Sequence, residues 1–151
     1  MRVCIGGTFD PLHKGHRALI EKAFEVGDYV LIGLTSDSMV KKMKILKTRN
    51  YRIRGKELKA YLKRKNFKNF RIVKINDRYG PSVYEDFDVI VVSPETEGIA
   101  YEINKVRMKN GKKSLKIYVI PFVLADDRKT IFSSRVKKGE IDIEGHIKQN
   151  I

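Results

Sequence analysis

Residues 6–16 read GGTFDPLHKGH, between an apolar run at residues 3–5 and an amphipathic run at residues 18–24. The glycine pair lets the backbone turn sharply without a Cβ clash. This order of residues predicts a strand, a glycine turn and a helix. In open α/β sheets, ligands bind in the crevice at the carboxyl ends of the strands. We therefore expect a ligand to bind at this turn.

The two histidines of this stretch lie three residues apart, so a helix places them on one face. Asp10-Pro11 is typical of a helix cap followed by a first-turn proline. A helix N-terminus is an anion site, where His13 and His16 can donate hydrogen bonds to phosphate oxygens. Gly15 leaves bare backbone against which a ribose or purine can lie. The histidine spacing alone also occurs in metal sites and by chance, but the whole stretch indicates a nucleoside triphosphate site.

The length of 151 residues fits one domain, which we expect to span residues 1–151. The sequence has no apolar run of about 18 residues and no signal-peptide pattern, so we expect a cytoplasmic protein without membrane association. Cys4 is the only cysteine and lies in a predicted core strand. It therefore supports neither a disulfide framework nor a cysteine metal site.

The net charge of +14 is concentrated in one segment. Residues 41–68 hold 13 Lys and Arg against a single acid, Glu57, which gives a net charge of +12. Such a segment indicates either an anionic partner, nucleotide or nucleic acid, or a solvated lysine-rich face. Lys41 and Lys42 should leave the carboxyl end of a strand near residues 6–16, where they can reach a shared phosphate.

Strands and helices are predicted to alternate along the whole chain. Apolar runs predict strands at residues 2–5, 29–35, 70–75, 89–92 and 116–122. Apolar spacing and caps predict helices at about residues 14–26, 51–65, 83–86 and 93–110, with short helices after 35–38 and after 131. This alternation predicts an α/β fold: a single Rossmann-like domain with an open five-stranded parallel sheet and helices on both faces. The sequence lacks G-x-G-x-x-G and G-x-x-x-x-G-K-[ST], which argues against a dehydrogenase or a P-loop kinase.

A second phosphate site is expected where residues 131–139 open the last helix. Ser133 and Ser134 offer two hydroxyls and free N–H groups at a helix start, and Arg135 can make a bidentate contact to a polyphosphate. By itself, this pattern also fits an ordinary serine cap.

Both segments resemble signatures of the nucleotidylyltransferase superfamily. Residues 6–16 resemble the first signature, and residues 131–135 resemble the second, Ile-Ser-Ser-x-Arg, with Phe132 where serine is usual. Further stretches look like the archaeal type of phosphopantetheine adenylyltransferase, at residues 77–81, 92–96, 123–126 and 139–142. The resemblance therefore covers nearly the whole chain.

This resemblance implies transfer of AMP from ATP to 4'-phosphopantetheine, giving dephospho-coenzyme A and pyrophosphate, with Mg²⁺ bound through the ATP phosphates. We then expect His16 to act at the α-phosphate and His13 at the β- or γ-phosphate, with Thr8 orienting the acceptor phosphate and Lys41 bridging both substrates. Nucleotide contacts are expected from Thr8, Phe9, His13, Gly15, His16, Ser93, Glu102, Asp126, Ser133, Ser134 and Arg135. Acceptor contacts are expected from Thr8, Lys41, Lys42, Tyr79, Gly80 and Pro81.

Bacterial relatives carry phosphate-binding arginines after the fourth strand, where this sequence has residues 93–96, Ser-Pro-Glu-Thr. Charge neutralisation is therefore expected elsewhere, from Lys41, Lys42, Arg52 or Arg135.

Two alternatives remain open at the level of the sequence. The first signature does not choose the acceptor, which leaves nicotinamide mononucleotide, FMN or glycerol 3-phosphate. The basic segment also allows a protein that binds nucleic acid without catalysis, with Tyr51, Tyr61 and Phe67 for stacking, although no nucleic-acid motif accompanies them.

Overall fold

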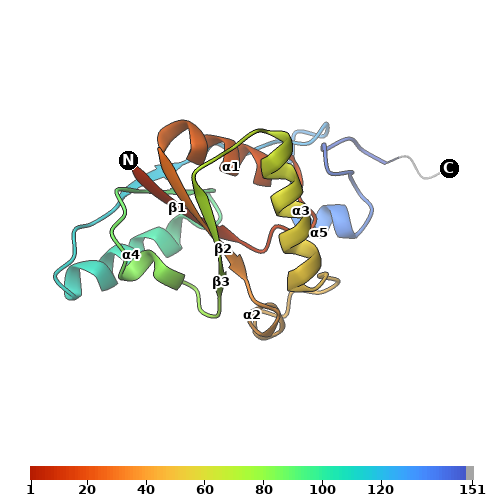
Figure 1. The fold of residues 1–151 in the computed structure, drawn as a ribbon. Coiled ribbons are helices and arrows are strands. Elements are labelled where there is room, and N and C mark those ends of the chain that lie inside the picture. Colours follow the sequence, from red (N-terminus) through yellow and green to blue (C-terminus); the bar gives the residue numbers. More distant parts are fainter. Residues whose placement is uncertain (149–151) are drawn as a thin grey trace.

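The computed structural model describes residues 1–148, and residues 149–151, the end of the expected domain, lie outside the described part. Strands and helices alternate along the chain, as predicted (Figure 1). The strands are β1 (Arg2–Gly7), β2 (Tyr29–Thr35), β3 (Phe70–Ile75), β4 (Val89–Val92) and β5 (Lys116–Val119). The helices are α1 (Lys14–Val26), α2 (Asp37–Lys42), α3 (Tyr51–Arg64), the 3₁₀ helix η1 (Gly80–Val83), α4 (Glu97–Lys109) and α5 (Ser133–Lys137).

The five strands form one parallel sheet in the order β3-β2-β1-β4-β5. Val3 of β1 pairs with Val30 of β2 on one side and with Val89 of β4 on the other. The chain therefore builds β2 and β3 on one side of β1, then returns past β1 to build β4 and β5. Such a reversal opens a crevice at the carboxyl ends of β1 and β4. The predicted Rossmann-like sheet is confirmed.

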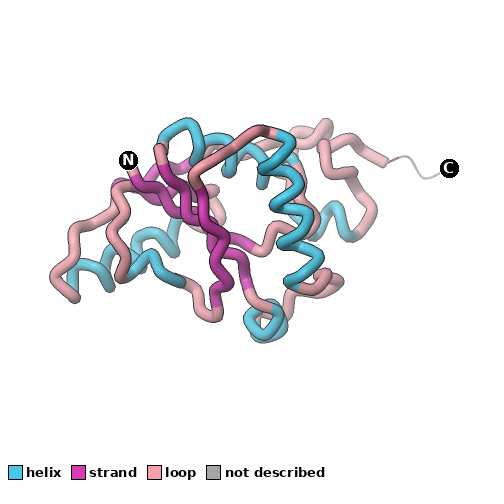
Figure 2. Tube along the Cα trace, in the orientation of Figure 1, coloured by secondary structure: helices cyan, strands magenta, loops and turns pink. Residues whose placement is uncertain are grey.

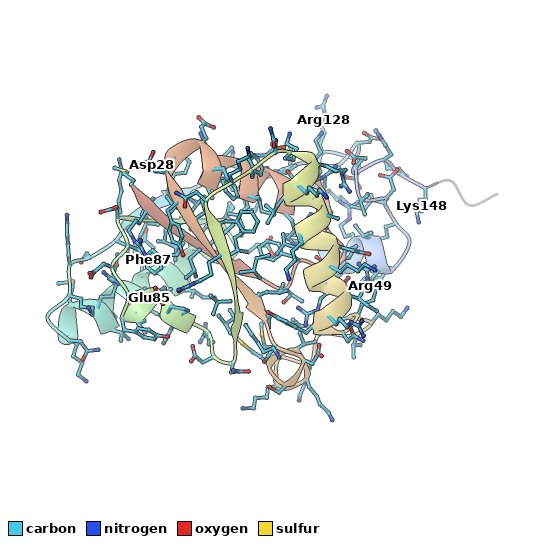
Figure 3. The ribbon with its side chains drawn as sticks, in the orientation of Figure 1. Asp28, Arg49, Glu85, Phe87, Arg128 and Lys148 are labelled. Atoms are coloured by element: carbon cyan, nitrogen blue, oxygen red, sulfur yellow. The ribbon has the colours of Figure 1, made fainter. Side chains whose placement is uncertain are left out.

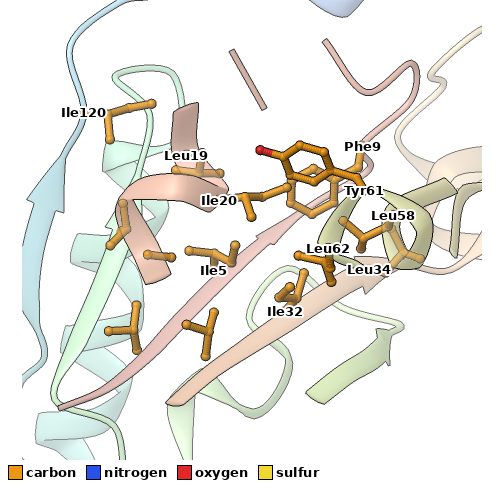
Figure 4. Packing of buried hydrophobic residues seen from close by; sticks show 14 of the residues in the cluster. Ile5, Phe9, Leu19, Ile20, Ile32, Leu34, Leu58, Tyr61, Leu62 and Ile120 are labelled. Atoms are coloured by element: carbon orange, nitrogen blue, oxygen red, sulfur yellow. The ribbon is translucent and has the colours of Figure 1, made fainter. Parts of the chain in front are cut away.

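Helices cover both faces of this sheet, with α1 and α3 on one face and α4 on the other (Figure 1). Each face carries its own hydrophobic core, the first beneath α1 and α3 and the second beneath α4. Successive strand residues point to opposite faces, so Ile5 lies in the first core and Cys4 in the second. Figure 4 shows the first core, where Ile20 of α1 and Leu62 of α3 pack with Ile5 and Ile32. Burial on both faces is why the central strands β1, β2 and β4 are nearly continuous apolar runs, whereas the edge strands β3 and β5 carry charged residues.

Several strand and helix boundaries differ from the prediction. β5 ends at Val119 rather than at residue 122, because its partner β4 ends at Val92 and because Pro121 has no N–H to donate. The short helical piece expected at residues 83–86 is η1 at residues 80–83, where Pro81 at the helix start fixes φ in the helical range.

α4 also begins later than predicted, at Glu97 rather than at residue 93. The side-chain oxygen of Thr96 accepts a hydrogen bond from the backbone N–H of Ser93 at 3.2 Å, and the N–H of Thr96 donates to the carbonyl of Ser93 at 3.1 Å. Residues 93–96 therefore form a turn between β4 and α4.

A membrane-crossing helix must be both long and strongly apolar. Across residues 1–148, no helix meets these two requirements.

Candidate active site

A cavity of about 550 Å³ lies over the carboxyl ends of β1, β2 and β4, where the strand order reverses. The loops after these parallel strands leave from one end of the sheet (Figure 2). The predicted site residues in its wall are Thr8, Phe9, His13, Gly15, His16, Tyr79, Pro81, Ser93, Ser133 and Ser134. The fold thus brings the two signature segments to one cavity.

His13 and His16 are joined by reciprocal hydrogen bonds at the start of α1. The backbone N–H of His16 donates to Nδ1 of His13 at 3.2 Å, and the backbone N–H of His13 donates to Nδ1 of His16 at 3.3 Å. The two rings stack with their centroids 3.7 Å apart and 11° between their planes. This reciprocal capping fixes both imidazoles at the helix N-terminus.

The capping also decides where each imidazole carries its proton. A ring nitrogen that accepts from a backbone N–H is unprotonated, so the neutral rings carry hydrogen on Nε2. Burial, with a contribution from the charge of Arg17, lowers the pKa of His13 to about 4. Burial, then the charges of His13 and Lys137, also lower the pKa of His16. At neutral pH, the site therefore presents two uncharged imidazoles with Nε2–H donors.

The predicted aspartate cap of this helix is wrong, because α1 begins at Lys14 with His13 as its cap. Asp10 is 3% exposed, and its carboxylate accepts from the backbone N–H of Arg49 at 2.8 Å and from Nε of Arg49 at 2.7 Å. This partner, 39 residues away in sequence, engages the Asp10 carboxylate. The His13 ring supplies the helix cap in its place.

Gly15 is constrained by the histidine that precedes it. A Cβ at this position would lie 2.9 Å from Cε1 of His13, so a side chain would displace the ring. Lys14, the residue before Gly15, contacts the C-terminal segment: its backbone N–H donates to the carbonyl of Ile143 at 2.8 Å. The helix start therefore has the cavity on one side and the C-terminal segment on another.

Thr8 and Phe9 form the turn between β1 and the histidines. The hydroxyl of Thr8 donates to the hydroxyl of Thr35 on β2 at 3.4 Å. Phe9 has a left-handed backbone, with φ at +50°, and its side chain is 1% exposed. Its ring meets the His16 ring edge-on with centroids 5.3 Å apart. Burial of the ring holds this unfavourable backbone conformation in place.

Within residues 1–148, the Lys and Arg residues in the cavity wall are Arg78 and Lys137, to which the sequence analysis gave no role. The ammonium of Lys137 donates to the carbonyl of Leu46 at 3.2 Å and to the hydroxyl of Thr48 at 3.0 Å. Burial lowers the pKa of Lys137. Helical spacing was a signal for this residue, because positions three and four apart on a helix share a face. Lys137 stands at those distances from Ser134 and Ser133.

The second signature segment opens α5 without a serine cap. Phe132 is the cap residue and makes no side-chain hydrogen bond there, so Ser133 and Ser134 are the first two helical residues. The guanidinium of Arg135 is bound by the carboxylate of Asp127 and, at 3.0 Å, by that of Glu140. The structure therefore places the serines at the cavity and engages Arg135 elsewhere.

The predicted residues outside the cavity wall are Lys41, Lys42, Arg52, Gly80, Glu102, Asp126 and Arg135. Lys41 and Lys42 are exposed on the last turn of α2, while Met39 and Met43 of the same segment line the cavity. Gly80, with φ at +55°, turns the chain between two wall residues.

Glu102 and Asp126 are engaged by neighbouring side chains. Glu102 on α4 accepts a hydrogen bond from the hydroxyl of Tyr79 at 3.3 Å and pairs with the guanidinium of Arg78 at 3.4 Å. Asp126 lies 3.2 Å from Nδ1 of His146. Glu102 is thus linked to two residues of the cavity wall, whereas Asp126 contacts the C-terminal segment.

Comparisons with known proteins identify relatives of this chain. A model of the cytidylyltransferase-like family matches residues 4–139. The chain is 46% identical to the phosphopantetheine adenylyltransferase of Methanosarcina barkeri, over 99% of this chain and 94% of that one. It is 42% identical to the phosphopantetheine adenylyltransferase of Archaeoglobus fulgidus, over 97% of this chain and 99% of that one.

Among solved structures, a protein of unknown function from Archaeoglobus fulgidus has a TM-score of 0.74 at 41% identity, covering 80% of this chain and 89% of that one. The family match extends over both segments that meet at the cavity. The chain therefore belongs to the cytidylyltransferase-like family and, within it, to the phosphopantetheine adenylyltransferases.

Proposed function

We propose that this chain transfers AMP from ATP to 4'-phosphopantetheine, which yields dephospho-coenzyme A and pyrophosphate. The observation that carries the proposal is the stacked pair of His13 and His16, which lie at a helix N-terminus, line the cavity and use Nδ1 for capping, so that Nε2–H is the remaining donor of each neutral ring. Such an arrangement suits phosphate oxygens. The choice of acceptor is supported by the archaeal relatives named phosphopantetheine adenylyltransferase.

The reaction requires little chemistry from the protein. An oxygen of the acceptor phosphate attacks the α-phosphorus of ATP, and the bond from that phosphorus to the β-phosphate oxygen breaks, which releases pyrophosphate. The attacking phosphate is already ionised at neutral pH, so no general base is needed. Catalysis then consists of positioning and of stabilising charge on the α-phosphate oxygens.

The imidazoles of His13 and His16 stabilise charge on different phosphates of ATP. His16 donates from Nε2 to an α-phosphate oxygen as charge develops there, and His13 donates to the β- or γ-phosphate. Because both rings are neutral, they act as hydrogen-bond donors and their protons stay in place. Ser133, Ser134 and Lys137, which also line the cavity, hold the triphosphate, and Lys137 supplies a positive charge for the leaving pyrophosphate.

The acceptor occupies the end of the cavity near β3. Thr8 orients the acceptor phosphate, and the apolar side chains of Met39, Met43 and Ile75 suit the uncharged pantetheine arm. Lys41 and Lys42 remain predicted contacts of the acceptor phosphate from the adjoining turn of α2.

The residues present fit a magnesium ion carried by the nucleotide. No group of three or more His, Cys, Asp or Glu residues that could hold a metal is found in residues 1–148. Mg²⁺ commonly takes most of its ligands from phosphates and water. Bound through the ATP phosphates, it would neutralise part of their charge, and Ser133 and Ser134 would be the residues whose hydroxyl oxygens could help to hold it.

The test is turnover with defined substrates. Purified protein with Mg²⁺, ATP and 4'-phosphopantetheine should release pyrophosphate and form dephospho-coenzyme A, detected by mass spectrometry. Parallel reactions contain nicotinamide mononucleotide, FMN or glycerol 3-phosphate, each with ATP and with CTP. Turnover of one of these acceptors without turnover of 4'-phosphopantetheine would overturn the proposal.

A further inference from the structure

We propose that Arg54, which lies outside the cavity wall, positions the catalytic turn for adenylyl transfer. This inference rests on the proposed function. Arg54 lies on α3, and its side chain is 0% exposed. A guanidinium removed from water in this way is costly unless its donors find partners. Those partners identify what the residue holds.

The Arg54 side chain joins three separate segments of the chain. Nη1 donates to the carbonyl of Thr8 at 3.2 Å, and Nε donates to the carbonyl of Arg49 at 2.8 Å. Nη2 donates to the carboxylate of Asp37, the first residue of α2, at 3.0 Å. The guanidinium is planar, so the directions of these bonds are fixed relative to one another. One side chain thus fixes Thr8 relative to α2 and α3.

A second arginine holds the same turn two residues further along. The carboxylate of Asp10 accepts from the backbone N–H and Nε of Arg49, and the other nitrogens of that guanidinium donate to Glu57 of α3 at 2.5 and 2.7 Å. Figure 3 shows Arg49 beside the N-terminal end of α3. Arginines anchored to α3 therefore hold both the Thr8 carbonyl and the Asp10 carboxylate.

Phe9 lies between these two held residues and contacts His16. Its left-handed backbone and its edge-on contact with the His16 ring both depend on the position of the turn at residues 8–10. A shift of the turn would move the Thr8 hydroxyl directly and would change the packing of His16 through Phe9. Misplacement of reacting groups by about 1 Å can cost on the order of 10²-fold in rate. Arg54 should therefore influence kcat more than ATP binding.

The first experiment compares two buried arginines in the full-length protein. Arg54→Lys keeps the positive charge but loses the planar guanidinium and its fixed bond directions. Arg107→Lys is the matched control, because Arg107 is 2% exposed and donates to the carbonyls of Lys113, Ser82 and Glu85. None of those bonds reaches the turn at residues 8–10. We expect Arg54→Lys to lower kcat by about 10- to 100-fold with the ATP KM changed less than about 3-fold. Arg107→Lys should lower Tm comparably and leave kcat within about 3-fold.

The second experiment requires no turnover. Proton–carbon NMR spectra of the histidine rings are recorded for the wild-type protein and both variants without substrates. Arg54→Lys should shift the ring signals of His16 and leave those of His146, which pairs with Asp126 outside the cavity wall. Arg107→Lys should leave both sets of signals in place.

The outcomes separate this inference from the proposed function. If the wild-type protein releases no pyrophosphate, the proposed function fails and the NMR comparison alone decides the positioning role. Unchanged His16 signals and an unchanged kcat in folded Arg54→Lys would overturn the inference, as would equal losses of kcat in the two variants. If Arg54→Lys does not fold, Arg49→Lys takes its place, because that side chain is 40% exposed. The same kinetic and NMR outcomes then decide.

Discussion

The rings of His13 and His16 stack at 3.7 Å while each Nδ1 accepts the other residue's backbone N–H. Protonation of either Nδ1 would remove an acceptor from the helix cap, and protonation of both would place two like charges in van der Waals contact. The pair is therefore structurally tied to the neutral state. The same contacts that stabilise the helix start keep the Nε2–H groups available to a ligand.

This coupling predicts a pH-dependent stability. His13 has a pKa of about 4 in the folded chain against an ordinary value of 6.5. Between these values the unfolded chain binds a proton that the native chain does not, so the free energy of unfolding falls as pH is lowered from 6.5 to about 4. The contribution of His13 is about 3 kcal/mol over this range. Urea unfolding at pH 7, 5.5 and 4.5 measures it.

His13→Asn is the matched control for that titration. Asparagine keeps a side-chain acceptor suited to a helix cap but does not titrate. The free energy of unfolding of this variant should fall less steeply with pH than that of the wild type. Equal slopes for the two proteins would show that the buried imidazole is not the source of the effect.

His16→Ala should lower kcat on the order of 10²-fold and change ATP affinity much less, because a donor aimed at developing charge acts mainly in the transition state. Steady-state kinetics and calorimetric titration with ATP measure the two effects. His146→Ala, which alters an exposed histidine outside the cavity wall, serves as the control. Equal losses of rate and of ATP binding in His16→Ala would contradict this role.

Lys137→Ala should raise the ATP KM about 10-fold, because it removes a partly buried cation at the proposed triphosphate position. Lys138→Ala, the exposed neighbour, should leave the ATP KM unchanged. Arg135→Ala should chiefly lower Tm, since Arg135 pairs with Asp127 and Glu140. A raised ATP KM in Arg135→Ala together with an unchanged one in Lys137→Ala would return the phosphate role to Arg135.

The basic segment should contain both functional and merely solvated lysines. Lys41→Ala, or Lys42→Ala if that residue makes the contact, should lower kcat/KM for 4'-phosphopantetheine about 30-fold or more. The triple change of Lys56, Lys59 and Lys63 to Gln should cost little, because these side chains are exposed on α3 and screened by salt. A larger loss in the triple variant than in either single variant would refute this division.

The arrangement of the sheet was largely predictable, because apolar strands, glycine turns and helix periodicity are local signals that agree along this chain. Both phosphate segments could be placed at one sheet edge for the same reason. The parallel sheet and the meeting of residues 6–16 with residues 131–134 are confirmed.

Distant ion pairs explain what the sequence analysis missed. Asp10 is a residue type that often caps helices, yet its carboxylate accepts hydrogen bonds from Arg49, which lies 39 residues away in sequence. Arg54 belongs to the basic segment but points inward to Thr8. Arg135 and Lys137 lie on one short helix, and Asp127 determines which of them is engaged away from the cavity. Such choices depend on tertiary partners, which local patterns do not encode.

The bond from Lys14 to the carbonyl of Ile143 has a consequence for biosynthesis. A ribosome has delivered every strand of the sheet once residue 119 has emerged, yet the helix start that carries both histidines still lacks this carbonyl. A nascent chain interrupted between these two points contains all five strands but not the carbonyl that accepts from Lys14. The helix start that carries both histidines is therefore completed late in translation, after the strands of the scaffold have been made.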